Sequence, residues 1–366
     1  MPLFALGFRP FYLLAGAFAA LAVPLRALQY TGWVPRTDPL WHAHEMLFGY
    51  AFAVIAGFLL TAVRAWTGRD TPAGAPLAAI AALWVVARVL AFYSLPSAVV
   101  ADALFAIAVA WGIGRALIAS GNRRNWFFIA LVLAIGGASI AFYSHPRIGL
   151  TIGLDVVLFV MAVIGGRGIP MFTNNAIPGA GARRIESLEK AALGAVLLLI
   201  GADLLSMEAV TRIAALAAAG LHAARLALWS PFKTFSKPIV WILHLSYAWI
   251  VVHLALRGLA GFGVVPISLA THALTVGAIG GMKLGMMTRT ARGHAGRPLS
   301  VGPSEIAAYL LVHAAAVVRV LLPLVWPAAY LWLISAAALI WSAAFAVFTL
   351  TYIPILSRPR LDGQAG

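Results

Sequence analysis

Two histidines flank a single alanine in the segment Trp41-His42-Ala43-His44-Glu45-Met46, at the head of a long apolar run. Imidazoles are rare in apolar membrane segments and usually mark a site, because polar side chains are costly in hydrocarbon. The chain has nine histidines and no cysteine. Thiolate-ligated clusters, zinc ribbons and covalent haem of the C-x-x-C-H kind are therefore excluded. Any haem or soft-metal chemistry in this chain must be built on imidazole.

The composition places these histidines in a membrane protein. Hydrophobic residues make up 63% of the chain and charged residues 10%, and the mean hydropathy is +0.95. A soluble domain carries roughly 25% charged residues. The net charge of +15 could suggest nucleic acid, but the basic residues lie in short loops between apolar runs. The expected partner is the lipid bilayer, with no nucleic acid, and we see no cleavable signal peptide at the start.

A membrane-spanning helix needs about 20 mostly apolar residues, and the sequence contains twelve such runs. They cover residues 9–29, 42–63, 76–94, 98–118, 126–143, 148–166, 188–206, 210–230, 238–258, 266–288, 304–324 and 328–350. Proline and glycine between the runs support most of these boundaries. We therefore expect an all-α polytopic helix bundle of about twelve transmembrane helices, forming a single integral membrane domain over residues 1–366.

The distribution of basic residues predicts the orientation of the bundle. Seventeen of the 26 Lys and Arg residues fall in segments on the same side as the N-terminus. The opposite loops hold only Arg36, Arg147, Arg212 and Arg257. Because Lys and Arg mark the cytoplasmic side, both termini are expected in the cytoplasm.

The second and tenth runs share a pattern at a constant shift of 228 positions. His44, Gly49, Gly57, Gly68 and Arg69 correspond to His272, Gly277, Gly285, Gly296 and Arg297. The tenth run comes eight runs after the second, as expected if three four-helix repeats form the bundle. The sixth run, which ends at 165–167, would then be a degenerate third copy.

The histidines fall into two layers by depth, at a rise of about 1.5 Å per residue. His42, His44 and His272 lie toward the outer face and are our candidates for a metal centre. On a regular helix the first two point about 200° apart, so both can face one ligand only if the helix begins between them. His222 and His244 lie deeper and are the candidates for a cofactor site, although either could be a packing residue.

Arg225 shares a helix face with His222. An arginine beside a membrane imidazole could hold a haem propionate, so Arg225 joins the candidate cofactor-binding residues.

Several motifs resemble the NnrS family from end to end of the chain. They are Gly7-Phe8-Arg9-Pro10-Phe11, Trp41 to Gly49, Gly165-Gly166-Arg167 with Pro170 to Asn175, Trp241 to Trp249, and His272 to Gly280. The resemblance implies a bacterial inner-membrane protein of twelve spans that contains haem and copper and is linked to nitric oxide metabolism and nitrosative stress. The family pattern has histidines at the positions of His42, His44, His222, His244, His272 and His294.

The expected function follows from the residues and the resemblance together. Non-covalent haem b at the inner histidines and copper at the outer ones would let the protein bind or turn over nitric oxide, or limit iron-nitrosyl damage. An unidentified redox partner is possible, and whether the chain is an enzyme stays open. The alternatives are a transporter of a metal or nitrosyl-related species, and an accessory protein for another haem enzyme.

Overall fold

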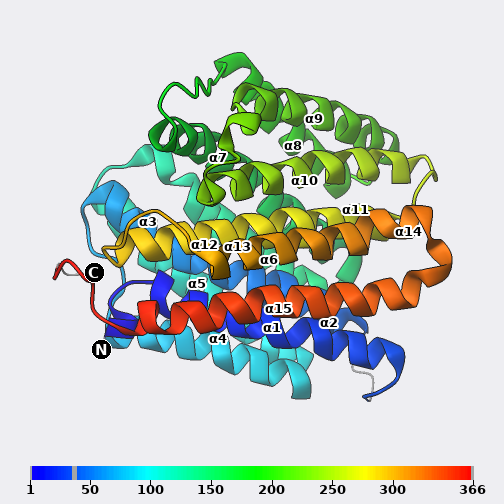
Figure 1. Ribbon diagram of the computed structural model, residues 1–366. Coiled ribbons are helices and arrows are strands. Elements are labelled where there is room, and N and C mark those ends of the chain that lie inside the picture. The colour runs from blue at the N-terminus through cyan, green and yellow to red at the C-terminus, as the bar shows by residue number, and fades with distance from the viewer. Residues whose placement is uncertain (1, 35–38, 364–366) are drawn as a thin grey trace. The chain divides into compact units, whose positions relative to one another are not determined.

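The computed structural model describes residues 2–34 and 39–363 of the chain. Throughout these residues the regular structure is helical, with no strand, which confirms the expected all-α class. The helices are α1 (Phe8–Thr31), α2 (Pro39–His44), α3 (Phe52–Thr67), α4 (Ala75–Tyr93), α5 (Leu95–Ala119), α6 (Phe127–Ser144), α7 (Pro146–Ala176), α8 (Glu186–Leu204), α9 (Glu208–Leu228), α10 (Pro238–Gly261), α11 (Ile267–His272), α12 (Gly281–His294), α13 (Pro303–Ala316), α14 (Leu322–Val325) and α15 (Tyr330–Ser357). Figure 1 shows their order along the chain.

Each of the twelve apolar runs folds as a helix or as consecutive helical pieces. Among the described residues, nine helical stretches are long and apolar enough to cross a membrane. The other three runs correspond to α8, α9 and the pair α11 and α12, which are also helical but carry more polar residues. The structure is therefore that of a multi-pass membrane helix bundle, as predicted.

Local chemistry accounts for where the helices begin and end. Proline occupies one of the first two positions of α4, α5, α10 and α13, where its missing N–H costs no helical hydrogen bond. The Ser94 hydroxyl accepts a hydrogen bond from the Ser97 N–H at the start of α5. At the end of α3, Gly68 adopts a φ of 65° and its N–H donates to the Arg64 carbonyl, a left-handed cap that favours glycine.

The chain divides into two compact units. Unit 1 comprises residues 1–154, 287–299 and 345–366, and unit 2 comprises residues 155–286 and 300–344. In unit 1, α1 packs on α3, and α5 packs on both α4 and α6. In unit 2, α9 packs along both α8 and α10 (Figure 1). The two units are described separately below.

The internal echo has a structural counterpart in two π-helices. His44 is followed directly by a π-helix over Glu45–Ala51, and His272 by one over Ala273–Gly280. π-Helical turns are rare and are frequent at functional sites. The glycines that follow the two copies, Gly68 and Gly296, have φ values of 65° and 70°. The sequence repeat therefore reproduces an unusual backbone geometry as well as residue types.

The sixth run, the expected third copy, lies within α7 together with Gly165-Gly166-Arg167. Unlike the other two copies, this segment is α-helical throughout and contains no π-helix.

Candidate functional site

Unit 2 contains a buried polar cluster built by α7, α8, α9 and α10. Its centre is His222 on α9, which has no exposed surface. The phenol oxygen of Tyr247 on α10 lies 2.6 Å from His222 Nδ1. Arg225, three residues after His222 on the same helix face, donates from Nη1 to the same phenol oxygen at 2.7 Å. Tyr247 therefore joins the imidazole to the guanidinium.

The other ring nitrogen of His222, Nε2, makes no hydrogen bond within ordinary geometric limits. Only one hydrogen lies in the short contact between Tyr247 and Nδ1, and either group can supply it. If the phenol donates, Nε2 carries a buried N–H, and the Ala192 carbonyl of α8 is an acceptor nearby. If the imidazole donates, Nε2 presents a lone pair, which is the form that binds a metal. In both cases Nε2 makes no hydrogen bond of ordinary geometry.

Glu189 on α8 holds Arg225 in place. Arg225 donates from Nε to Glu189 Oε1 at 3.1 Å and from Nη2 to Oε2 at 2.8 Å, and Nη2 also reaches the Ala162 carbonyl on α7 at 3.1 Å. This side-on, two-oxygen pairing is the strongest arginine–carboxylate geometry. Because all three nitrogens of Arg225 have protein partners, its evident role here is to position Tyr247 and His222.

Gly166 on α7 makes this pairing possible. A Cβ at Gly166 would lie 1.8 Å from Arg225 Nη2 and 2.8 Å from Glu189 Oε2. No side chain fits there while the ion pair is formed. The glycine that the sequence singled out near the end of the sixth run thus admits the arginine.

His244 on α10 borders the same cluster. Its Nδ1 lies 3.2 Å from the Val240 carbonyl, and its Nε2 lies 3.2 Å from the Trp229 carbonyl and 3.3 Å from Thr173 Oγ1. A neutral imidazole has one N–H and can donate to only one of the two carbonyls. One nitrogen of His244 is therefore held weakly. Trp229, whose carbonyl faces His244, also has its ring 4.6 Å from the Tyr247 ring, which connects His244 to the cluster.

Unit 1 contains the outer pair of histidines. His44 is buried, with Nδ1 2.9 Å from Glu45 Oε1. Its Nε2 lies 3.3 Å from Ser139 Oγ and 3.5 Å from Asp102 Oδ2. Arg88 on α4 donates to Glu45 Oε1 at 2.9 Å and to Asp102 Oδ1. Arg88 thus bridges the two carboxylates.

This outer cluster favours an additional positive charge. One guanidinium faces two buried carboxylates, and Glu45 Oε2 has no hydrogen-bond partner. A bound cation would balance the charge. Within the described residues, however, no three His, Asp or Glu side chains are arranged to hold a metal ion. A metal at His44 would have to displace Arg88 from its carboxylates.

His42 and His44 lie two residues apart on one helix. Both lie within α2, which the structure describes from Pro39, so the helix does not begin between them. His42 is half-buried while His44 is fully buried, as expected for side chains that diverge by about 200°. The doublet therefore presents its two imidazoles in different directions.

His272, at the equivalent position of unit 2, is bound by an arginine. Its Nδ1 lies 2.7 Å from the Ser268 carbonyl, which fixes the proton on Nδ1 in the neutral ring. Its Nε2 faces Arg319 Nη2 at 3.3 Å. Arg319 also contacts Ser268 Oγ at 3.3 Å and the Tyr330 hydroxyl at 3.4 Å. The lone pair of His272 therefore lies on Nε2, where it already contacts Arg319.

An ion pair in unit 2 was missed by sequence reasoning. Asp155 pairs with Arg257 at 2.5 Å, and Arg257 also binds Asp203. The sequence places Arg257 among the outer-loop residues, whereas it lies inside α10. Sequence spacing did not show which carboxylates it would meet.

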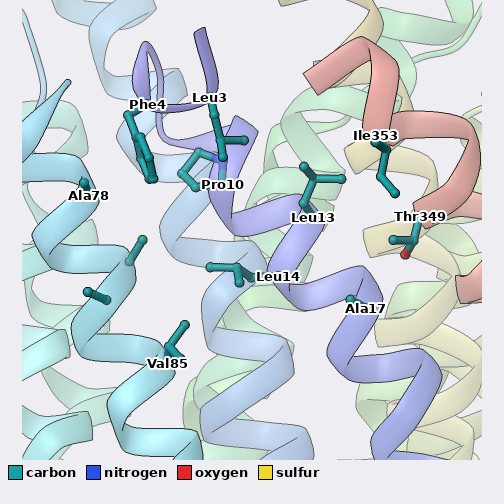
Figure 2. Close-up of a pocket in the computed structure, with 12 residues that line it drawn as sticks. Leu3, Phe4, Pro10, Leu13, Leu14, Ala17, Ala78, Val85, Thr349 and Ile353 are labelled. Carbon is teal, nitrogen blue, oxygen red and sulfur yellow. The ribbon is translucent and has the colours of Figure 1, made fainter. Parts of the chain in front are cut away.

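An apolar cavity in unit 1 is lined by residues that offer no group for catalysis or metal binding. It measures about 500 Å³ and is lined by residues of α1, α4 and α15. Figure 2 shows Leu13 and Leu14 against Val85 and Ile353. Its only hydroxyl, on Thr349, donates to the Phe345 carbonyl of its own helix. The buried polar clusters are therefore the candidate sites.

The comparison with family models settles which family these clusters belong to. The model described as NnrS protein matches residues 2–360. The chain belongs to the NnrS family. A search of curated proteins finds no match. Membership makes this chain a nitric oxide-related membrane protein, and the match covers both units and every histidine discussed above.

Proposed function

We propose that this NnrS family member binds haem b in the bacterial inner membrane through His222 and His244, and thereby lowers the toxicity of nitric oxide. It would do so by binding or turning over the gas, or by limiting iron-nitrosyl damage. The observation that carries the proposal is the open Nε2 of His222. It is a fully buried imidazole nitrogen with no hydrogen-bond partner, whose opposite nitrogen is fixed by Tyr247.

The residues around His222 fit a haem ligand. Histidines that bind metals almost always donate their other N–H to an oxygen, which fixes the tautomer and the ring orientation. Tyr247 supplies that oxygen, and Arg225 polarises it. His244 can release one nitrogen at low cost, because only one of its two carbonyl contacts is a hydrogen bond in the neutral ring. The zero cysteine content is consistent with non-covalent haem b.

Haem iron bound at His222 would supply the nitric oxide-binding chemistry. The protein would exclude water from that site, since His222, Arg225 and Tyr247 are all buried. Nitric oxide is small and apolar, so it partitions into membranes and needs no aqueous cleft. A bundle with buried polar clusters suits such a substrate.

The copper proposal rests on His42, His44 and His272. In unit 1 the charge balance around His44 favours a cation, and imidazole and carboxylate both suit copper. The ligand set of His44, Glu45 and Asp102 would form only when Arg88 moves away. His272 presents a correctly protonated ring whose Nε2 would have to leave Arg319.

Optical spectra of purified variants test the haem proposal. The protein is made with ample haem, purified anaerobically and reduced with dithionite. The wild type should show a Soret band, and His222→Ala should lose most of it. His145→Ala is the control, because His145 is exposed in a loop and should keep the full band. Absence of the band from folded wild type, or an equal band in His222→Ala, would overturn the proposal.

Transport of a metal or nitrosyl-related species is the second candidate function. It predicts flux in proteoliposomes that depends on Asp155. In the structure Asp155 is bound to Arg257, and such a fixed ion pair is not a free carrier group. An accessory role for another haem enzyme predicts co-purification with that enzyme and no bound cofactor.

A further inference from the structure

A second buried arginine, Arg9, stands at the start of α1 in unit 1. It has no exposed surface. Its Nη1 donates to the carbonyls of Leu356 at 3.0 Å and Arg358 at 2.7 Å, and so caps the end of α15. Its Nε and Nη2 make no hydrogen bond. A buried donor without a partner is costly, and more so when it is charged.

The two unused nitrogens form one edge of the guanidinium. Along this edge Nε–H and Nη2–H run parallel, and their spacing matches two oxygens of a carboxylate or phosphate. Arg225 uses the same edge to bind both oxygens of Glu189. Within residues 2–34 and 39–363, no carboxylate forms an ion pair with Arg9. The edge is therefore shaped for an oxyanion that the described chain does not supply.

The surroundings of Arg9 are positively charged. Its guanidinium lies 5.4 Å from the Phe8 ring centroid, and the His294 ring lies 5.7 Å from the same ring. Arg9, Arg64 and Arg360 all lie close enough to act electrostatically on His294. Asp362 pairs with Arg360 at 2.6 Å. The local field therefore attracts an anion.

A third arginine strengthens this inference. Arg297 Nε is also buried without a hydrogen-bond partner, and it belongs to the same unit and follows α12 closely. The end of α12 is tied to the C-terminal segment by a hydrogen bond from Leu361 N–H to the Ala295 carbonyl at 3.2 Å. Two buried guanidinium groups of unit 1 thus each leave at least one N–H without a hydrogen bond.

We propose that the Nε and Nη2 edge of Arg9 binds the phosphate group of a ligand, either a lipid headgroup or soluble phosphate. The site lies at the end of unit 1 where the cationic loops gather, the side that we predict to be cytoplasmic. Anionic headgroups concentrate at that surface and attract Lys and Arg. The carbonyls that Arg9 binds belong to the end of α15 and to the exposed residues directly after it. This site is independent of haem and copper.

Calorimetric titration of the delipidated full-length protein in neutral detergent tests the proposal. The two probes are inorganic phosphate and a short-chain phosphatidylglycerol. The wild type should bind at least one of the two probes. Arg9→Lys should weaken that binding at least about tenfold, because lysine keeps the positive charge but lacks the two parallel N–H groups of the guanidinium. Arg358→Gln is the matched control, since Arg358 contacts Arg9 only through its backbone carbonyl, and it should bind as the wild type does.

The outcome also identifies the source of the phosphate. Binding of inorganic phosphate indicates a soluble anion, and binding of the lipid alone indicates a headgroup. If neither probe binds folded wild type, or if Arg9→Lys binds equally well, the proposal is wrong. Should Arg9→Lys fail to fold, thermal unfolding of the wild type decides instead. A ligand for the native state must raise the melting temperature with concentration, and no rise with either probe would overturn the site.

Discussion

The phenol oxygen of Tyr247 lies 2.6 Å from His222 Nδ1 and 2.7 Å from Arg225 Nη1. One hydroxyl on α10 therefore fixes both an imidazole and a guanidinium of α9. Glu189 fixes the same guanidinium from α8. The result is a chain of contacts across three helices that leaves one nitrogen, His222 Nε2, open inside the bundle.

Removing the phenol oxygen should loosen this chain without removing the proposed ligand. Tyr247→Phe keeps the ring that packs on Trp229 and deletes the partner of His222 Nδ1. Loss of such an outer partner typically weakens metal binding about 10- to 100-fold. We expect haem to bind in that weaker range, with a shifted Soret maximum, as measured by haem titration of the purified variant. Unchanged affinity and spectrum would show that Tyr247 does not orient a haem ligand.

Breaking the buried ion pair should destabilise the protein. Glu189→Gln leaves Arg225 without its carboxylate, and removal of one partner from a buried pair costs about 3–5 kcal/mol. Glu186→Gln is the control on the same helix, because its pair with Lys190 is exposed and is worth about 0–1 kcal/mol. Thermal unfolding in detergent compares the two. Equal melting temperatures for the two variants would contradict the assigned role of Glu189.

The position of Gly166 allows a test without changing any polar group. Gly166→Ala should force Arg225 away from Glu189, because the new Cβ would meet Nη2 at 1.8 Å. We expect a lower melting temperature and reduced haem retention. Gly194→Ala on α8 is the matched control, since a Cβ there meets nothing within 4 Å, and alanine in a helix is favoured by up to about 1 kcal/mol. A harmless Gly166→Ala would mean that the pairing tolerates displacement.

In the outer cluster of unit 1, bound copper should replace the positive charge of Arg88 when that arginine is substituted. Arg88→Gln leaves Glu45 and Asp102 unbalanced beside His44, and we expect the metal-free variant to lose about 3–5 kcal/mol of stability. Added copper should restore much of this loss by binding the native state. Thermal unfolding with and without copper, followed by metal analysis, measures both effects. Destabilisation that copper does not relieve would count against a metal site at His44.

Much of the fold could be predicted from the sequence. Twelve apolar runs and the proline and glycine between them gave the helices, because membrane spans must be continuous helices with satisfied backbones. The repeat between His44 and His272 also proved structural, since both residues lead into π-helices. Helix ends were less predictable. Arg257, expected in a loop, lies within α10, where two carboxylates neutralise it.

The candidate site was predictable only in part. His222, Arg225 and His244 were found from type and spacing, and the structure brings the first two into one network with Tyr247. Glu189 was the missed residue, although an acidic group at the edge of a span was a sign that it needed a partner. Sequence spacing shows which residues share a helix face, but it does not show which other helix supplies the opposite charge.

Anaerobic titration of the reduced, haem-loaded protein with nitric oxide tests the central claim most directly. The account predicts that the Soret band of the wild type shifts on addition of nitric oxide. His222→Ala should show neither the band nor the shift, while His145→Ala should show both. A haem band that does not respond to nitric oxide, or a response that survives in His222→Ala, would contradict it.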